Sequence, residues 1–422
     1  MLPRQRIVGI DVCRSMAIIA AMSSHAFVAS GAFEHNHSAA MIWFRFFTQL
    51  SPPIFIGLFG SMLYIAYRPK FASGQTLAGV QQLLSRSAQC YILYVICIAA
   101  RVFEGSFSIG YGLRCALLIG VTPFVDILKF YALMLAAAPI IIAVSTRYRF
   151  GLAILLGLSA IPHLAHPLWA HLEPLPKVFG RDYLSFPASF LYGGAAGAGG
   201  PSLLHGLYLV VYGMWLGRTA NNLLSGDGAG RNKARHALFI GTVLSALISA
   251  GLWDWQDPYG TVRAISDMSL RNLNHPLYYA LGTCAMTVAA WAALEFYDVR
   301  RGQFGRSLTF IGASSLFTFS FGNIILILAP RVTTQPLGSL VYGLALLAIV
   351  IVMSWTFRRA LERGAQKRQL GESGVAAWFQ SAQGKTVARI HETVFRPSRT
   401  YAKMLHSLLR KPSAPIVGDS PR

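Results

Sequence analysis

The sequence is poor in charged residues, and above all in acidic ones. Only 13% of its 422 residues are charged, with 16 acidic against 37 basic side chains, while 54% are hydrophobic. Soluble domains average about 25% charged residues, so the composition excludes an ordinary soluble domain. The length accommodates about ten membrane-crossing helices of roughly 20 residues each, plus loops and a tail. The composition therefore predicts an all-α, polytopic integral membrane protein.

Cysteine is also scarce, and its spacing excludes common cysteine chemistry. The chain has five cysteines, none in a CxxC or Cys/His pattern typical of a metal site. Each lies in or beside an apolar segment, which favours small buried side chains over disulfides or ligands. No cluster of acids and histidines has ligand spacing, so we expect no metal cofactor. The basic start lacks a convincing small-residue cleavage site, so we expect no cleavable signal, and no internal repeat is visible.

Ten apolar runs are predicted to cross the membrane, and a short amphipathic stretch at 110–121 is predicted to be interfacial or re-entrant. Loops on alternate sides of these runs carry the basic residues, so the positive-inside rule predicts that both termini are cytoplasmic. The predicted spans are about 10–30, 43–66, 87–103, 124–145, 148–162, 201–217, 236–253, 276–297, 308–329 and 336–356.

The chain divides into a predicted transmembrane domain, 1–356, and a basic cytoplasmic tail, 357–422. The tail contains one plausible amphipathic helix, about 374–395, and an end that is predicted to be disordered. A basic helix after the last span usually lies on the cytoplasmic leaflet and contacts anionic lipid. The net charge of +21 is thus assigned to the loops and the tail, and nucleic acid is not an expected partner.

The first apolar run contains an ionisable stripe. His25 follows Arg14 by eleven positions, which is about three full helical turns and roughly 16 Å along the axis, so both side chains share one face. Asp11 falls on the same stripe. Ionisable side chains inside a membrane helix are costly and usually mark a functional site.

The residue types on this stripe indicate a chemistry. The guanidinium of Arg14 suits a phosphate or pyrophosphate group, and Asp11 can pair with it or orient it. The imidazole of His25 can take a proton from an alcohol near neutral pH and return it to a leaving group. The alternative for His25 is an ordinary histidine that makes a hydrogen bond between helices.

Five further residues are candidates for acceptor binding, each with a structural alternative. Asp126 and Lys129 stand three apart and either form a site or are an interfacial pair whose lysine snorkels. Asn323 lies inside an apolar run, where a hydrogen bond between helices is the alternative. His205, after a Pro-Ser cap, and Arg271, just before the eighth span, either contact an acceptor or support the structure.

These motifs resemble the membrane-bound acyltransferase-3 superfamily. Arg14 and His25 match its R-x10-H pattern, with Ile10 and Asp11 before the arginine and Ser15 after it. The stretches PFVDILKFYALMLAAAP at 123–139 and SLFTFSFGNIIL at 315–326 resemble the branch that includes glucan succinyltransferases of the OpgC type.

The resemblance implies an integral enzyme of the plasma membrane, here a bacterial inner membrane. Such an enzyme takes an acyl group, acetyl or succinyl, from cytoplasmic acyl-CoA and places it on a hydroxyl of an extracytoplasmic or lipid-linked glycan. His25 would be the catalytic histidine, and Arg14 and Arg86 would bind the donor. Many members carry paired arginines where this chain has Arg86 alone. Membrane lipid, the glycan acceptor and proteins of glycan biosynthesis would be its partners.

Two other functions remain open. A secondary transporter could use Asp11, Arg14 and His25 as a proton or anion relay, although the paired repeats common in transporters are not visible. A non-enzymatic membrane subunit for glycan export or sensing is the other alternative, with the basic tail as a docking element.

Overall fold

The computed structural model describes residues 7–170, 184–193, 201–225, 227–304, 307, 309–332, 335–369 and 375–409. Within these ranges the regular structure is helical and contains no strand, so the predicted all-α class is confirmed. The predicted disordered end lies outside the described residues.

The described part of the chain contains eight helices, or continuous helical runs, long and apolar enough to cross a membrane. Several runs combine consecutive elements. The eight are α1 (Val8–Ala29), α3 to α5 (Ala39–Gln49, Ser51–Met62, the π-helical turn η1 Leu63–Tyr67, and Arg68–Ala72), α6 (Thr76–Phe103), α8 (Asp126–Arg147), α9 (Gly151–Leu164) running into α10 (His166–Ala170), α13 (Gly228–Leu252), α16 (Pro276–Ala293) with the π-helical turn η2 (Leu294–Val299), and α19 (Pro336–Gln369).

The two remaining predicted spans are also helical, with differences. The run at 201–217 becomes α12 (Leu203–Ser225), a helix packed among the others, with most of its residues buried. The run at 308–329 is interrupted, because α17 (Thr309–Ala313) ends before α18 (Ser315–Leu328) begins. The broken segment packs against α1, where Ser15 Oγ accepts a hydrogen bond from the Gly312 N–H at 2.8 Å.

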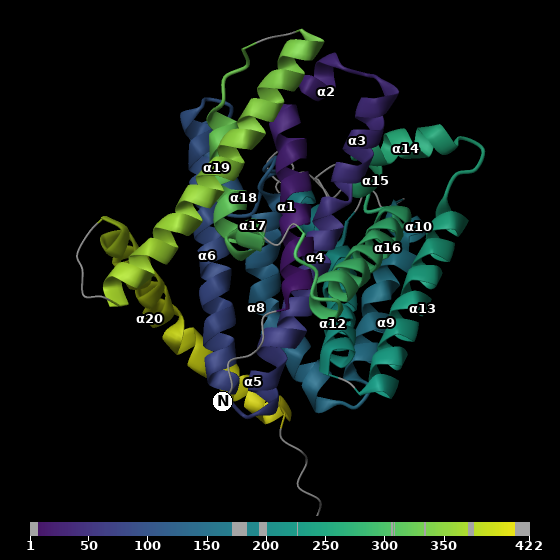
Figure 1. Cartoon of the computed structure of the whole chain (residues 1–422), viewed down its shortest axis with the longest axis vertical. Coiled ribbons are helices and arrows are strands. Elements are labelled where there is room, and N and C mark those ends of the chain that lie inside the picture. The colour runs from purple at the N-terminus through teal and green to yellow at the C-terminus, as the bar shows by residue number, and fades with distance from the viewer. Residues whose placement is uncertain are drawn as a thin grey trace, which may run out of the picture.

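Helix α1 stands in the middle of the bundle (Figure 1), in contact with α4, α16, α17, α18 and α19. Its first turn is anchored from a distant element, because the Asp298 carboxylate accepts hydrogen bonds from the Val8 and Gly9 N–H groups at 2.8 and 2.7 Å. A carboxylate at a helix N-terminus satisfies otherwise unpaired donors and complements the helix dipole. The helix that carries the ionisable residues is therefore anchored at its first turn.

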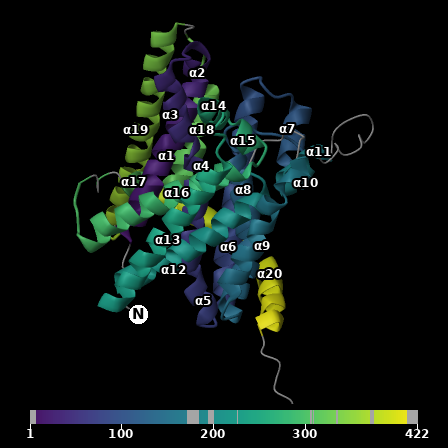
Figure 2. The ribbon, with the colours of Figure 1, turned by 90° about the vertical axis from the view of Figure 1, so that its right-hand side faces the viewer.

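Short helices gather toward the end of the bundle at which α1 terminates, as the two views in Figures 1 and 2 show. We refer to this as the His25 end and to the opposite one as the Arg14 end. The short helices are α2 (Ala32–His35), α7 (Ile109–Ala116), α11 (Ser185–Tyr192), α14 (Pro258–Ser266) and α15 (Ser269–Asn272).

Two long helices form the carboxyl-terminal part of the described chain, and the first of them runs through residue 357, where the predicted transmembrane domain ends. Helix α19 continues without a break to Gln369, and α20 (Val375–Leu409) is longer than the predicted amphipathic helix and packs along α6, α8 and α19. Tyr401 donates a hydrogen bond to the Ala136 carbonyl at 3.1 Å, and Leu405 is fully buried. The described part of the tail is thus packed on the bundle.

Helices α4 and α12 approach each other unusually closely through small residues. A Cβ placed on Gly213 would lie 1.9 Å from the Gly57 carbonyl oxygen, and Ser61 Oγ donates to the Gly213 carbonyl at 2.9 Å. Small residues permit such close approach between membrane helices.

A pair of matched glycine substitutions tests this packing. Gly213→Ala should destabilise the fold by about 1–3 kcal/mol, because the new methyl group meets backbone that cannot rotate away. Gly157→Ala in α9 should be neutral or stabilising, since nothing lies within 4 Å of a Cβ there. Thermal unfolding of both variants in detergent checks this, and equal melting temperatures would contradict the packing.

Candidate active site

Both ends of the ionisable stripe face the interior of the bundle. The Arg14 guanidinium is close to its partner Asp11, at 3.7 Å, and the two side chains are 17% and 13% exposed. His25 contacts side chains of α18 and of the segment before α8. The predicted arrangement on one inward face of α1 therefore agrees with the structure.

The imidazole of His25 is held by Asn323, and the geometry fixes its tautomer. Asn323 Nδ2 donates to the Phe124 carbonyl at 3.2 Å, so the amide oxygen must face His25. His25 Nδ1 lies 2.7 Å from that oxygen and must carry the proton, because an amide oxygen only accepts. In the neutral imidazole Nε2 then keeps its lone pair, and it makes no hydrogen bond within the described part of the chain. An imidazole in this state is suited to act as a base.

Phe124 is the aromatic wall of this site. Its ring meets His25 edge to face, with centroids 4.8 Å apart, and the Arg101 guanidinium lies over the same ring at 5.1 Å. Phe124 adopts a left-handed backbone conformation, with φ of 74°, which is rare for an aromatic residue and is often found at functional sites. Arg101 also pairs with Glu104, three positions along the chain, at 3.9 Å, and this local partner gave no indication of its position beside Phe124.

Arg271 lies on α15, at the same end of the bundle as His25, and its guanidinium contacts Met268 Sδ at 3.7 Å. Tyr278 donates to the Gln49 carbonyl at 3.0 Å, and the Gln49 amide donates to Ser24 Oγ at 3.4 Å, beside His25 on α1. Of the predicted acceptor residues, Asn323 contacts His25 directly, and Arg271 lies on a short helix at the same end of the bundle.

The Arg14 end has a different lining. Tyr131 of α8 donates its hydroxyl hydrogen to the Phe55 carbonyl at 2.9 Å. Arg86 of α6 is exposed and donates to Gln89 Oε1 at 3.0 Å. Of the two predicted donor arginines, Arg14 is thus mostly enclosed by the bundle, and Arg86 lies at its surface.

Asp126 and Lys129 form a pair, but the predicted snorkelling alternative is wrong. Lys129 is only 2% exposed, lies 3.4 Å from Asp126, and also donates to the Gly120 carbonyl. Asp126 accepts from Thr122 Oγ1 at 2.8 Å. These contacts fold the turn before α8 that carries Phe124 and its carbonyl, so the pair supports the His25 site from behind.

His205 belongs to a separate cluster of histidines. It is 1% exposed, and its Nδ1 bonds Ser202 Oγ at 2.8 Å, as the predicted cap implies. Its ring lies 4.8 Å from that of His163 and 5.8 Å from that of Tyr279, whose hydroxyl donates to Asn274 at 2.6 Å. His275 precedes α16 and lies outside the membrane-spanning segments. Burial, followed by the charge of His166, lowers the pKa of His275. The neutral ring caps α16 by accepting a hydrogen bond from the Leu277 N–H. The rings of His163 and His205 contact each other and the ring of Tyr279. The histidine cluster is therefore separate from His25, whose partner is Asn323.

The residues described do not assemble a metal site, since no group of three or more His, Cys, Asp or Glu side chains in them could hold an ion. The polar groups that could contact a donor or acceptor are cations, an imidazole and amides. Such groups bind phosphates and sugar hydroxyls and move protons.

A comparison with protein families shows that the part of the chain carrying this site is similar to a family of membrane acyltransferases. Residues 6–197 match the family model described as heparan-alpha-glucosaminide N-acetyltransferase, catalytic. The matched part includes Asp11, Arg14, His25 and Arg86, whereas Arg271 and Asn323 lie beyond it. The match does not extend to the predicted glucan succinyltransferase branch. Among curated proteins, none matches the chain.

The buried Asp126–Lys129 pair allows a test of its role. Asp126→Asn leaves a buried ammonium without its carboxylate and should cost about 3–5 kcal/mol, and Lys129→Met should cost less because Asp126 keeps Thr122. The double variant should recover most of the loss. Thermal unfolding measures all three, while a double variant as unstable as the sum of the single ones would argue against a supporting pair.

Proposed function

We propose that this chain transfers an acetyl group from acyl-CoA to a sugar hydroxyl of an extracytoplasmic or lipid-linked glycan. The observation that carries the proposal is the fixed tautomer of His25, which leaves Nε2 as a proton acceptor at the site where α1, α18 and Phe124 meet. The match to an acetyltransferase family over residues 6–197 supports the acyl group and the acceptor class.

The reaction balances with the groups present. His25 Nε2 removes the proton of the sugar hydroxyl as its oxygen attacks the thioester carbonyl. The tetrahedral intermediate collapses with cleavage of the carbon–sulfur bond. The proton then passes from Nε2 to the departing thiolate, which leaves as coenzyme A. Asn323 stabilises the imidazolium by accepting the Nδ1 hydrogen bond throughout, in the manner of an orienting partner in a catalytic triad.

The donor enters from the Arg14 end in this proposal. Arg14 and Arg86 would bind the phosphate groups of acyl-CoA, because guanidinium groups match phosphate oxygens bidentately. The rise from Arg14 to His25 is roughly 16 Å. The extended pantetheine arm of coenzyme A would bridge this distance between the phosphates at Arg14 and the thioester at His25. The positive-inside rule places this end in the cytoplasm, where acyl-CoA is made, and a bacterial inner membrane is the corresponding location.

The acceptor would lie at the His25 end, between Arg271 and Arg101. Their donors suit sugar oxygens, and Phe124 supplies an apolar face for a pyranose ring. A sugar amine is a second candidate acceptor, because the matching family is described by N-acetyl transfer to a glucosaminide. The same base would serve, since an amine must also lose a proton after attack. Succinyl transfer remains an alternative acyl group, and proteins of glycan biosynthesis would be the functional partners.

Acetyl transfer by the purified protein tests the proposal directly. Labelled acetyl-CoA is incubated with the reconstituted chain and a panel of glucans, glucosaminides and lipid-linked glycans. His25→Ala should lower kcat by on the order of 10²–10⁴, the usual contribution of a general base. Asn323→Ala should lower kcat by at least tenfold with little change in KM, because the tautomer is no longer held.

The matched control for this assay is His236→Ala, an exposed histidine of α13 that bonds only the Asn232 carbonyl. It should keep full activity. Glycan uptake without label on the sugar would favour the transporter alternative, and neither uptake nor label would favour the non-enzymatic subunit.

Donor binding is separable from the chemical step. Arg14→Gln should raise the KM for acetyl-CoA by about tenfold, since each lost charge-assisted contact is worth about 1.5–3 kcal/mol at most. The KM for the glycan should stay within a factor of two. Arg218→Gln, an exposed cation on α12, is the control, and an equal effect on both KM values would refute a specific donor role for Arg14.

A further inference from the structure

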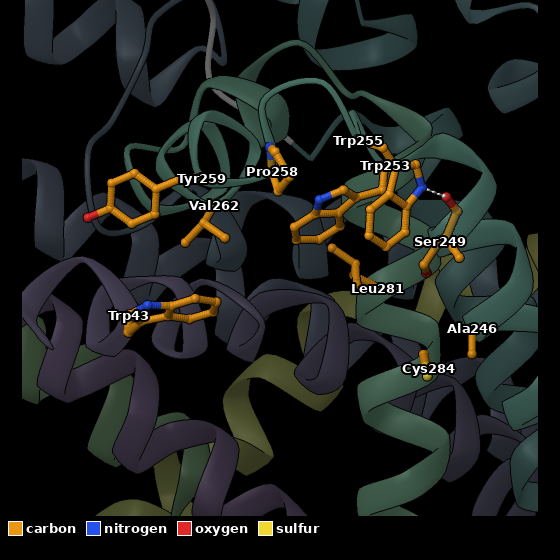
Figure 3. Close-up of a pocket in the computed structure, with 11 residues that line it drawn as sticks. Trp43, Ala246, Ser249, Trp253, Trp255, Pro258, Tyr259, Val262, Leu281 and Cys284 are labelled. Carbon is orange, nitrogen blue, oxygen red and sulfur yellow. Dashed lines mark hydrogen bonds between the residues drawn. The ribbon is translucent and has the colours of Figure 1, made fainter. Parts of the chain in front are cut away.

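An aromatic pocket outside the His25 site opens between α3, α13, α14 and α16 (Figure 3). Its volume is about 540 Å³, and its wall contains the indoles of Trp43, Trp253 and Trp255 and the ring of Tyr259. Ala246, Leu281 and Cys284 form its floor. Trp253, Trp255 and Tyr259 follow one another closely in the sequence, whereas Trp43 joins them only in the folded chain.

The chemistry of the wall selects hydrocarbon over sugar. The wall is mainly aromatic and aliphatic, and two of its polar groups are engaged within the protein: Ser249 Oγ donates to the Ser245 carbonyl at 2.7 Å, and the Trp255 indole donates to the Ala250 carbonyl at 2.8 Å. A sugar in such a pocket would find few partners for its hydroxyls, which costs free energy. An apolar chain loses nothing and gains burial against the rings.

The position of the pocket gives an apolar chain a route from the bilayer. Leu244, Leu247 and Ile248 on α13 flank the lining residue Ala246 and are each more than half exposed, as expected for a face toward lipid. Just beyond the end of α13, Asp254, Gln256 and Asp257 are exposed and polar. The pocket therefore stands where an apolar tail and a polar headgroup would separate.

Two walls of the pocket also border the His25 site. Helix α3 carries Trp43 in the pocket and Gln49 beside Ser24, while α16 carries Leu281 in the pocket and Tyr278 bonded to Gln49. A molecule with its tail in the pocket would thus have its head directed toward the outer loops next to His25.

We infer that this pocket binds the hydrocarbon anchor of a lipid-linked glycan acceptor, holding the sugar near His25. The inference rests on the proposed function for the identity of the head, while the binding of the chain itself does not require catalysis. A bulk phospholipid is the competing occupant, and the experiment below separates the two.

Cys284 provides a readout that is independent of activity. It lines the pocket and is partly exposed, whereas Cys13, Cys90, Cys97 and Cys115 are buried. The full chain is held in amphipol without added lipid or acyl-CoA, and the rate of Cys284 alkylation by N-ethylmaleimide is followed by mass spectrometry. Octyl glucoside below its micellar concentration should slow alkylation at least fivefold, and glucose should have no effect.

Matched variants on adjacent positions locate the protection. Ala246→Trp fills the pocket and should abolish the effect of octyl glucoside, while Leu247→Trp places the same side chain on the lipid-facing side of α13 and should leave it intact. In the acetyl-transfer assay, Ala246→Trp should raise the KM for a chain-bearing acceptor at least tenfold and leave that for the free sugar unchanged.

The outcomes are distinct. Equal protection by octyl phosphocholine assigns the pocket to bulk lipid and overturns the inference, as does an absence of protection by octyl glucoside. Protection that is selective for octyl glucoside and lost in Ala246→Trp supports it even if no acetyl transfer occurs, in which case the proposed function fails alone. Equal KM values for chain-bearing and free acceptors would refute a role of the pocket in acceptor binding.

Discussion

The hydrogen bond between His25 and Asn323 is the interaction on which the proposed site depends. In an apolar bundle a polar side chain without a partner is costly, so the imidazole is bound to a definite acceptor and the amide to a definite carbonyl. The Phe124 carbonyl accepts from the Asn323 amide nitrogen, and this orients the Asn323 oxygen to accept from His25. The cost of burial thereby fixes which imidazole nitrogen keeps its lone pair. The hydrogen bond between helices, which was the structural alternative for these residues, is therefore also the contact on which the proposed catalytic role depends.

The surrounding elements hold this series of hydrogen bonds in place. Asp298 fixes the start of α1, the interrupted α17–α18 segment brings Asn323 to the level of His25, and Lys129 with Asp126 shapes the turn that presents Phe124. Each of these supports lies far from His25 in the sequence. The short helices gather at this end of the bundle, on the side where the acceptor is expected.

The sequence predicted the local relations well and the distant ones poorly. The helical period alone placed Asp11, Arg14 and His25 on one face, and the residues before His205 predicted the cap that Ser202 forms. Asn323 could be predicted only as a polar residue in an apolar run, because its contact with His25 spans 298 positions. Arg101 was missed for a similar reason, since a nearby glutamate offered a local explanation. The predicted boundary at 357 is that of a membrane span and not of a helix: α19 continues through it, since charge ends a membrane span but not a helix, and the Arg358–Glu362 pair supports the continuation.

The packing of α20 changes how the end of this chain should be regarded. Gln81 of α6 donates to the His391 carbonyl, and Ser398 and Leu405 are buried against neighbouring helices. Shortening the protein before residue 409 would strip a wall from α6 and α8, the two helices that carry Arg86 and Tyr131. A tag or fusion partner that replaced any part of α20 would therefore disturb the bundle, because this helix is one of its packed elements.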